Sequence, residues 1–230
     1  MKRKINYWAV IVYYIIAIAC RYLTNKTELL HAIDNPYLTS ILTGMGHALG
    51  AGIVFVTFKI KPILSLKGNY RSLLFPITLY WIFPVVLIST VSYFSKGTIP
   101  YLTVFTVLIY GLLEEIGWRG FLYQEFKTLK PIYNILLLSL LWFLWHLNFD
   151  FTPVHFSFFA ILVLGSWGIG KVADATGSLV AVSAFHSLNN FFPGINAKSG
   201  AILGILLLVW VIALVVRKKM KLAASVYKAN

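Results

Sequence analysis

Residues 101–126 read YLTVFTVLIYGLLEEIGWRGFLYQEF, and this stretch decides the fold. It is long and apolar enough to cross a bilayer as a helix, which takes about 20 residues. Its second half nevertheless contains Glu114, Glu115 and Arg119. An ionisable group inside a membrane costs about 2.5–3.5 kcal/mol by insertion scales. We therefore expect a membrane-spanning helix whose charged residues serve a function.

The rest of the chain has the same apolar character. Its 230 residues are 59% hydrophobic and 12% charged, whereas a soluble domain is about 45–50% apolar and about 25% charged. Aromatic residues make up 16% of the chain, which excludes a disordered protein. The single cysteine, Cys20, excludes an internal disulfide. These proportions exclude a soluble enzyme.

The apolar residues fall into long runs separated by short polar segments. We predict an all-α, polytopic membrane protein, a bundle of about eight transmembrane helices that forms one domain over residues 1–230. The fifth and seventh runs are short and could tilt or end below the interface. The eight runs cover residues 5–23, 39–60, 73–94, 101–126, 132–148, 154–170, 178–192 and 201–216.

The charge of the chain sets its expected orientation. The net charge is +13, from 20 Lys and Arg against 7 Asp and Glu. With the N-terminus in the cytoplasm, 15 of these cations fall inside, and only Arg21, Lys26, Lys96 and Lys198 fall outside. The positive-inside rule then predicts a multi-pass protein of the cell membrane with both termini cytoplasmic. Lipid headgroups account for the basic charge, and no motif for nucleic-acid binding accompanies it.

Helical spacing separates the three charged residues of the fourth run. Glu115 and Arg119 are four residues apart, so they share a helix face and can pair. Glu114 is rotated by about 100° from Glu115 and lacks an equally natural partner within the helix. A carboxylate in that environment suits a general base or acid. The alternative is an interhelical polar cluster that only holds the bundle together.

Two later runs add histidines and amides. His146 is followed by only two more residues of the fifth run, and alone it could be an interfacial histidine. His186 and Asn190 are four residues apart in the seventh run, with Asn189 nearly as close. Together, the three runs supply groups suited to activating water and binding an oxyanion. At about 1.5 Å per residue, His146 is expected near the outer interface, whereas Glu114 could lie near the middle of the membrane.

These residues resemble the CAAX protease and bacteriocin-processing family of intramembrane endopeptidases, also called the Abi family. Its pattern is EExxxR, FxxxH and HxxxN on three transmembrane helices. The first motif is complete from Glu114 to Arg119, and the third from His186 to Asn190. The second departs from the pattern, because Trp142 replaces the phenylalanine four residues before His146. The resemblance covers residues 101–192, a catalytic core formed by the fourth, fifth and seventh runs.

The resemblance implies a role for each matching residue. Glu114 would be the catalytic carboxylate and would activate water together with His146. His186 and Asn190 would stabilise the oxyanion, and Glu115 with Arg119 would be a structural pair. The small chain, without an added domain, looks like the bacterial members. The implied substrate is a small hydrophobic or membrane-associated peptide, in bacteriocin or signal-peptide processing or in immunity.

Two alternatives accompany this prediction. Glu114, His146 and His186 could instead be three zinc ligands with an open fourth position. The chain has no HExxH pair, and the family resembles glutamate-dependent enzymes, so we favour a mechanism without a cofactor. The other alternative is a membrane regulator or immunity protein that binds a peptide without cutting it. A proton-relaying transporter is disfavoured, because no internal repeat or pair of broken helices is evident.

A further histidine receives a structural interpretation. His47 lies in a stretch of small residues, 44–50, which favours close packing of helices. We therefore expect it to make a polar packing contact outside the catalytic site.

Overall fold

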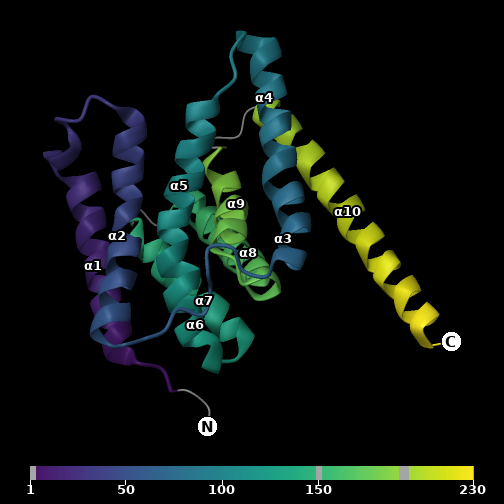
Figure 1. Cartoon of the computed structure of the whole chain (residues 1–230). Coiled ribbons are helices and arrows are strands. Elements are labelled where there is room, and N and C mark those ends of the chain that lie inside the picture. Colours follow the sequence, from purple (N-terminus) through teal and green to yellow (C-terminus); the bar gives the residue numbers. More distant parts are fainter. Residues whose placement is uncertain (1–3, 149–151, 192–196, 230) are drawn as a thin grey trace.

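The structure is a computed structural model, and it describes residues 4–148, 152–191 and 197–229. Within these ranges the chain is helical, with no strand (Figure 1). A π-helical turn at Thr78–Ile82 joins α3 to α4, and a second at Trp118–Leu122 joins α5 to α6. The helices are α1 (Tyr7–Lys26), α2 (Pro36–Thr57), α3 (Tyr70–Ile77), α4 (Phe83–Lys96), α5 (Tyr101–Gly117), α6 (Tyr123–Glu125), α7 (Pro131–Trp145), α8 (Pro153–Thr176), α9 (Leu179–Asn190) and α10 (Ala197–Ala229).

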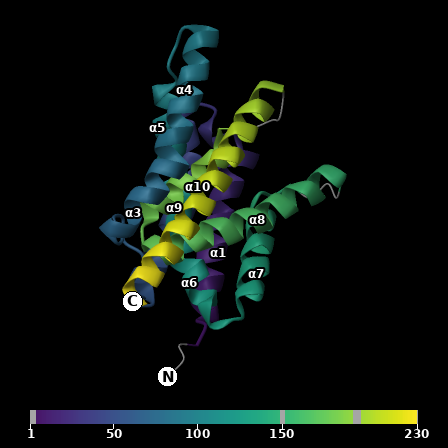
Figure 2. The ribbon, with the colours of Figure 1, turned by 90° about the vertical axis from the view of Figure 1, so that its right-hand side faces the viewer.

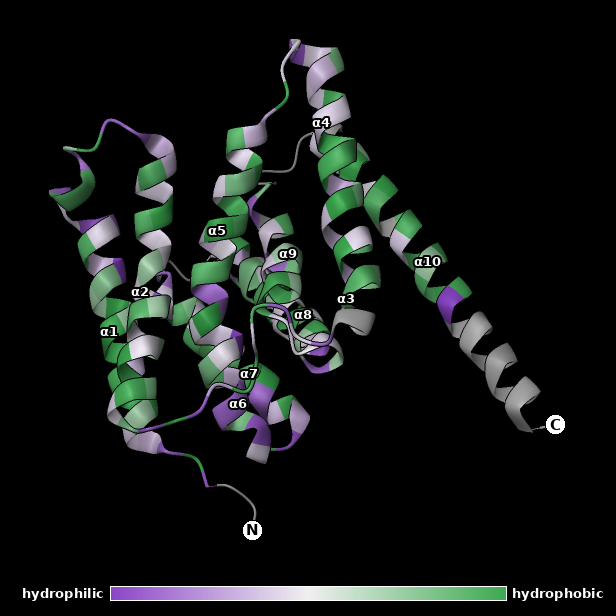
Figure 3. Cartoon of the chain, viewed as in Figure 1, coloured by the Kyte–Doolittle hydropathy of each residue, from purple (hydrophilic) through white to green (hydrophobic). Residues whose placement is uncertain are grey.

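The predicted polytopic membrane architecture is confirmed. Among the described residues, six helical stretches are long and apolar enough to cross a membrane. The two shorter apolar helices, α7 and α9, correspond to the fifth and seventh runs of the sequence. Figure 3 shows apolar residues along most of the helices and polar residues gathered at their connections and at α6. The six long stretches are Tyr7–Lys26, Pro36–Thr57, Leu73–Lys96, Tyr101–Thr128, Pro153–Thr176 and Ser199–Arg217.

The ends of several helices follow directly from local sequence. The side chain of Asn6 accepts a hydrogen bond from the amide of Ala9 and begins α1. Asn35 caps α2 in the same way, with Pro36 in the first turn, where a missing N–H costs nothing. Gly97 and Gly177 end α4 and α8 in the left-handed conformation that glycine adopts without strain.

Helix α5 lies between α2 and α9, so the helix with the two glutamates is enclosed by neighbours (Figure 1). Glycines permit this close packing. A Cβ at Gly46 of α2 would lie 2.6 Å from the Cβ of Cys20 on α1. A Cβ at Gly111 of α5 would lie 2.7 Å from Oγ of Ser187 on α9. These small residues let the helix backbones approach, as is common in membrane bundles.

Gly117→Ala is expected to destabilise the bundle. A Cβ at this position would lie 2.4 Å from the Tyr13 hydroxyl and 2.9 Å from the Cβ of His47, and both side chains are fully buried. Overpacking of this kind costs about 1–3 kcal/mol, so the variant should melt at a lower temperature in detergent. Gly52→Ala is the matched control, because a Cβ there has no neighbour within 4 Å. Equal melting temperatures for both variants would contradict the prediction.

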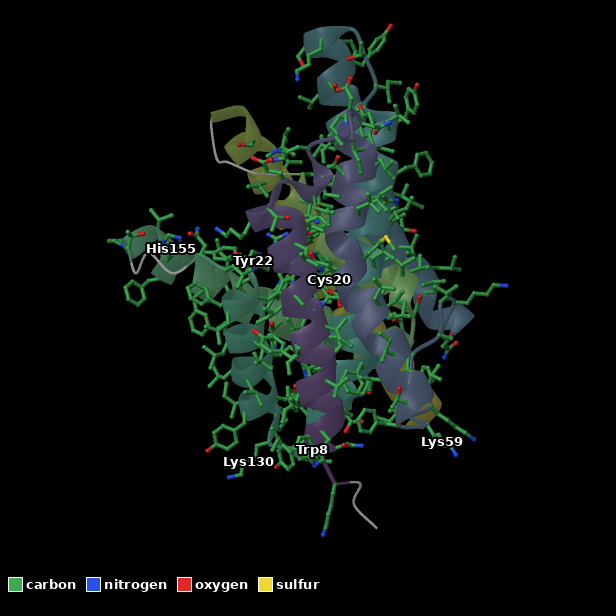
Figure 4. The ribbon with its side chains drawn as sticks, turned by 90° about the vertical axis from the view of Figure 1, so that its left-hand side faces the viewer. Trp8, Cys20, Tyr22, Lys59, Lys130 and His155 are labelled. Atoms are coloured by element: carbon green, nitrogen blue, oxygen red, sulfur yellow. The ribbon has the colours of Figure 1, made fainter. Side chains whose placement is uncertain are left out.

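The basic residues and the short helix α7 locate one end of the molecule. Lys59 and Lys130 lie at the same end of the molecule as Trp8 (Figure 4). This agrees with the prediction that both lysines face the same side of the membrane. Helix α7 begins at this end, and its 15 residues span about 22 Å, less than the ~30 Å hydrocarbon core. Helix α8 then runs at an angle to α7, and its N-terminal part extends away from the bundle (Figure 2).

Candidate active site

Two adjacent glutamates on α5 form the centre of the site. Glu114 and Glu115 are 1% and 0% exposed, so both carboxyl groups are buried in the protein. A buried ionisable group needs a partner, because desolvation penalises an isolated charge. The two side chains find different partners, and this difference separates their possible roles.

Glu115 holds two side chains from different segments. Its Oε1 lies 2.6 Å from Nη1 of Arg119, so the ion pair expected from the i, i+4 spacing is present. The same oxygen lies 2.5 Å from Nδ1 of His186 on α9. Since a carboxylate only accepts, Nδ1 of His186 must donate this bond. Glu115 therefore links α5 both to the π-helical turn that holds Arg119 and to α9.

Glu114 faces the other side of the same imidazole. Its Oε2 lies 3.5 Å from Nε2 of His186, and Tyr110, one turn earlier on α5, lines the same cavity as Glu114. His186 therefore sits between the two glutamates, with Nδ1 on Glu115 and Nε2 toward Glu114. Both of its ring nitrogens face carboxylates, which differs from the oxyanion contact implied by the family resemblance.

His146 joins the site from the C-terminal end of α7. Its Nδ1 lies 2.8 Å from the carbonyl oxygen of Trp142, so Nδ1 donates and the basic lone pair is on Nε2. The Trp142 ring packs against His186, with ring centroids 5.1 Å apart, and the Arg119 guanidinium lies 4.9 Å from its centroid. The tryptophan that departs from the family motif thus contributes packing.

The four residues expected to carry the chemistry line one cavity of about 140 Å³. They are Glu114, His146, His186 and Asn190, accompanied by Tyr110 and a wall of apolar side chains from α8. The structure thus brings His146 and Glu114 to one cavity, although the residue count separated them in depth. The count assumed that α7 crosses the full bilayer, whereas its 15 residues are too few for a complete crossing.

Asn190 has an unused donor, as does Trp142 in the same cavity lining. Nδ2 of Asn190 is buried and has no hydrogen-bond partner among the residues that the structure describes. A buried donor left without an acceptor costs about 1–3 kcal/mol. A negatively charged oxygen in the cavity would supply that acceptor. The amide is thus suited to receive an oxyanion.

Two polar residues of the site were missed from the sequence, Tyr110 and Arg21. Tyr110 precedes Glu114 by four residues, so helical spacing alone could have identified it. The absence of a Cβ at Gly44 leaves room for its ring. Arg21 of α1 approaches Tyr110, and its guanidinium lies 4.2 Å from the centroid of the Trp145 ring. Arg21 was counted among the cations on the outer side of the membrane, and no sequence spacing connects α1 to α5.

His47 lies beside this site without lining its cavity. Its Nδ1 is 2.6 Å from the hydroxyl of Tyr13, and its ring packs against Trp118 and Trp145. This is the polar packing contact expected from the surrounding small residues.

The proposed zinc ligands do not form a recognisable metal site. In the described part of the chain, no group of three or more His, Cys, Asp and Glu side chains is arranged to hold a metal ion. Glu114 and His186 approach one another, but His146 does not complete a triad with them.

Comparison with known proteins agrees with the motifs. Residues 96–192 match the family model described as type II CAAX prenyl endopeptidase Rce1-like, which confirms the resemblance to the CAAX protease and bacteriocin-processing family. The match covers α5 to α9, the helices that line the cavity. No curated protein matches the chain. The matched family is a protease family, and with the long apolar helices it supports a multi-pass membrane peptidase.

Proposed function

We propose that this protein is a glutamate-dependent intramembrane endopeptidase that hydrolyses a peptide bond in a small hydrophobic or membrane-associated peptide. The observation that supports it is a buried carboxylate, two imidazoles and an unpartnered amide donor around one cavity. Binding alone does not require an unpaired amide beside a buried glutamate. The proposed substrates include the precursors of bacteriocins and of peptide signals. They also include peptides against which an immunity protein would protect the cell.

In the proposed mechanism, Glu114 is the general base. It takes a proton from a water molecule that His146 helps to orient through Nε2, and the water oxygen attacks the carbonyl carbon. The carbonyl oxygen then becomes an oxyanion, to which Nδ2 of Asn190 donates. When the C–N bond breaks, the proton held by Glu114 passes to the leaving amine. Glu115 keeps His186 in place beside Glu114.

The test of this proposal is cleavage by the detergent-purified protein, with and without a strong chelator. A mixture of hydrophobic peptides in micelles serves as substrate, and mass spectrometry identifies the products. We expect a cleavage rate that the chelator changes by less than about two-fold, since no step uses a metal. Loss of cleavage with chelator and recovery with zinc would make Glu114, His146 and His186 metal ligands instead. An absence of cleavage across the mixture would favour a non-catalytic regulator.

Tyr110→Phe is expected to lower kcat about ten-fold. The substitution removes only the hydroxyl, which lies beside Glu114 in the cavity lining and is placed to donate to its carboxylate during the reaction. A hydrogen bond to a charged group contributes about 1.5–3 kcal/mol. Tyr101→Phe on the same helix is the matched control, because that side chain is exposed. The rates of both variants are compared under saturating peptide. Equal rates would show that the hydroxyl does not position the carboxylate.

A further inference from the structure

A second cavity, of about 340 Å³, lies between the α6 region, α7 and α8. It shares no lining residue with the candidate active site. Its polar lining residues include Tyr123, Lys127, Asn134, Lys171 and Asp174. The proposed peptidase chemistry uses none of them.

The charges of this cavity leave one lysine uncompensated. Nζ of Lys127 lies 2.8 Å from Oδ1 of Asp174, and the hydroxyl of Tyr123 donates to the other oxygen of Asp174 at 2.9 Å. Lys171 precedes Asp174 by three residues on α8, and it has no ion-pair partner among the residues that the structure describes. The cavity therefore carries a net positive charge and attracts an anion.

A buried acceptor, Oδ1 of Asn134, adds a second requirement that a ligand of this cavity would have to meet. Nδ2 of Asn134 donates to the carbonyl oxygen of Tyr123 at 3.2 Å, which fixes the amide plane. Oδ1 of the same amide is buried and has no hydrogen-bond partner in the described part of the chain, although Asn134 lines the cavity. Such an oxygen needs a donor. A ligand that satisfies both features presents an anionic group to the lysines and a hydroxyl to Asn134.

The position and the remaining walls of the cavity indicate a lipid. Lys130, which lies at the basic end of the molecule (Figure 4), begins the turn into α7, whose first residue lines the cavity. Leu129, Ile135 and Trp167 supply apolar walls, and Trp167 is 54% exposed. Charged groups beside apolar walls match the boundary between headgroup and acyl chains.

We propose that this cavity binds the headgroup of an anionic glycerophospholipid of the phosphatidylglycerol type. Its phosphodiester lies between Lys127 and Lys171, and a headgroup hydroxyl donates to Oδ1 of Asn134. The apolar walls contact the glycerol backbone and the first methylene groups of the chains. A soluble phosphate ester shares the anionic chemistry but makes no use of these walls.

The test is native mass spectrometry of the full-length protein in detergent, titrated with phosphatidylglycerol or with phosphatidylcholine. We expect preferential retention of phosphatidylglycerol. The double variant Lys127→Gln/Lys171→Gln should lower the affinity for phosphatidylglycerol about 25-fold. Each lysine near a lipid phosphate contributes about five-fold to the affinity, and the two contributions multiply. Lys59→Gln/Lys61→Gln, which removes the same charge at the same end, should bind as the wild type does.

An equal loss of phosphatidylglycerol affinity in the two double variants would show that only the net charge matters. This result would overturn the proposal. Competition by glycerol 3-phosphate at concentrations near that of the lipid would identify a soluble ester as the ligand. Lys171→Gln alone is a second test and should lower the affinity about five-fold. Among the described residues Lys171 has no ion pair, so its substitution removes none that stabilises the fold. Brominated phosphatidylglycerol should quench the fluorescence of the wild type more than that of Trp167→Phe. Equal quenching would place the lipid elsewhere.

Discussion

Glu114→Gln is expected to abolish peptide cleavage while the protein remains folded. Glutamine keeps the size of the side chain, and its carbonyl oxygen can still accept a hydrogen bond. It cannot take a proton from water, and general acid–base catalysis contributes about 10²–10⁴-fold to a rate. We therefore expect turnover to fall by about 10³-fold or more, measured as product formed by equal amounts of purified protein.

The control for this variant must separate catalysis from folding. Glu28→Gln removes an exposed carboxylate from the turn between α1 and α2, so it should cleave at the wild-type rate. Both variants should elute and melt like the wild type in detergent. Cleavage retained by a folded Glu114→Gln protein would sink the proposed base and leave His146 as the alternative group to activate water.

The helices and the pairing of Glu115 with Arg119 were accessible from the sequence because they depend on local rules. Apolar runs of about 20 residues require helices in a bilayer, and the i, i+4 spacing pairs Glu115 with Arg119. The same rule, applied to Tyr110, would have identified the hydroxyl beside Glu114. Each of these relations lies within one helix.

Relations between helices were not accessible in this way. The depth of His146 depends on where α7 begins relative to α5, and a residue count assumes that every span crosses the full bilayer. The contact between Arg21 and Tyr110 depends on the packing of α1, α2 and α5, which glycines such as Gly44 and Gly46 permit. The basic cavity between α7 and α8 also requires three-dimensional packing, because Lys127 and Lys171 are 44 residues apart in sequence.

Glu115→Ala is expected to lower the yield of folded protein and its melting temperature sharply. The change leaves the fully buried Arg119 without its carboxylate and removes the acceptor of Nδ1 of His186. Loss of one partner of a buried ion pair costs about 3–5 kcal/mol. Arg119→Ala should have a similar effect, because it leaves Glu115 with His186 alone. Yield after size-exclusion chromatography and thermal melting in detergent measure both effects.

A double variant separates the structural role of the pair from its effect on the site. Glu115→Leu/Arg119→Met removes both buried charges, and apolar replacement of a buried pair is often neutral for stability. It should recover most of the folded yield. Cleavage should stay low, because His186 still lacks the acceptor that fixes its ring beside Glu114. Wild-type yield and melting for Glu115→Ala would refute the structural role, whereas full activity of the double variant would show that Glu115 does not position His186.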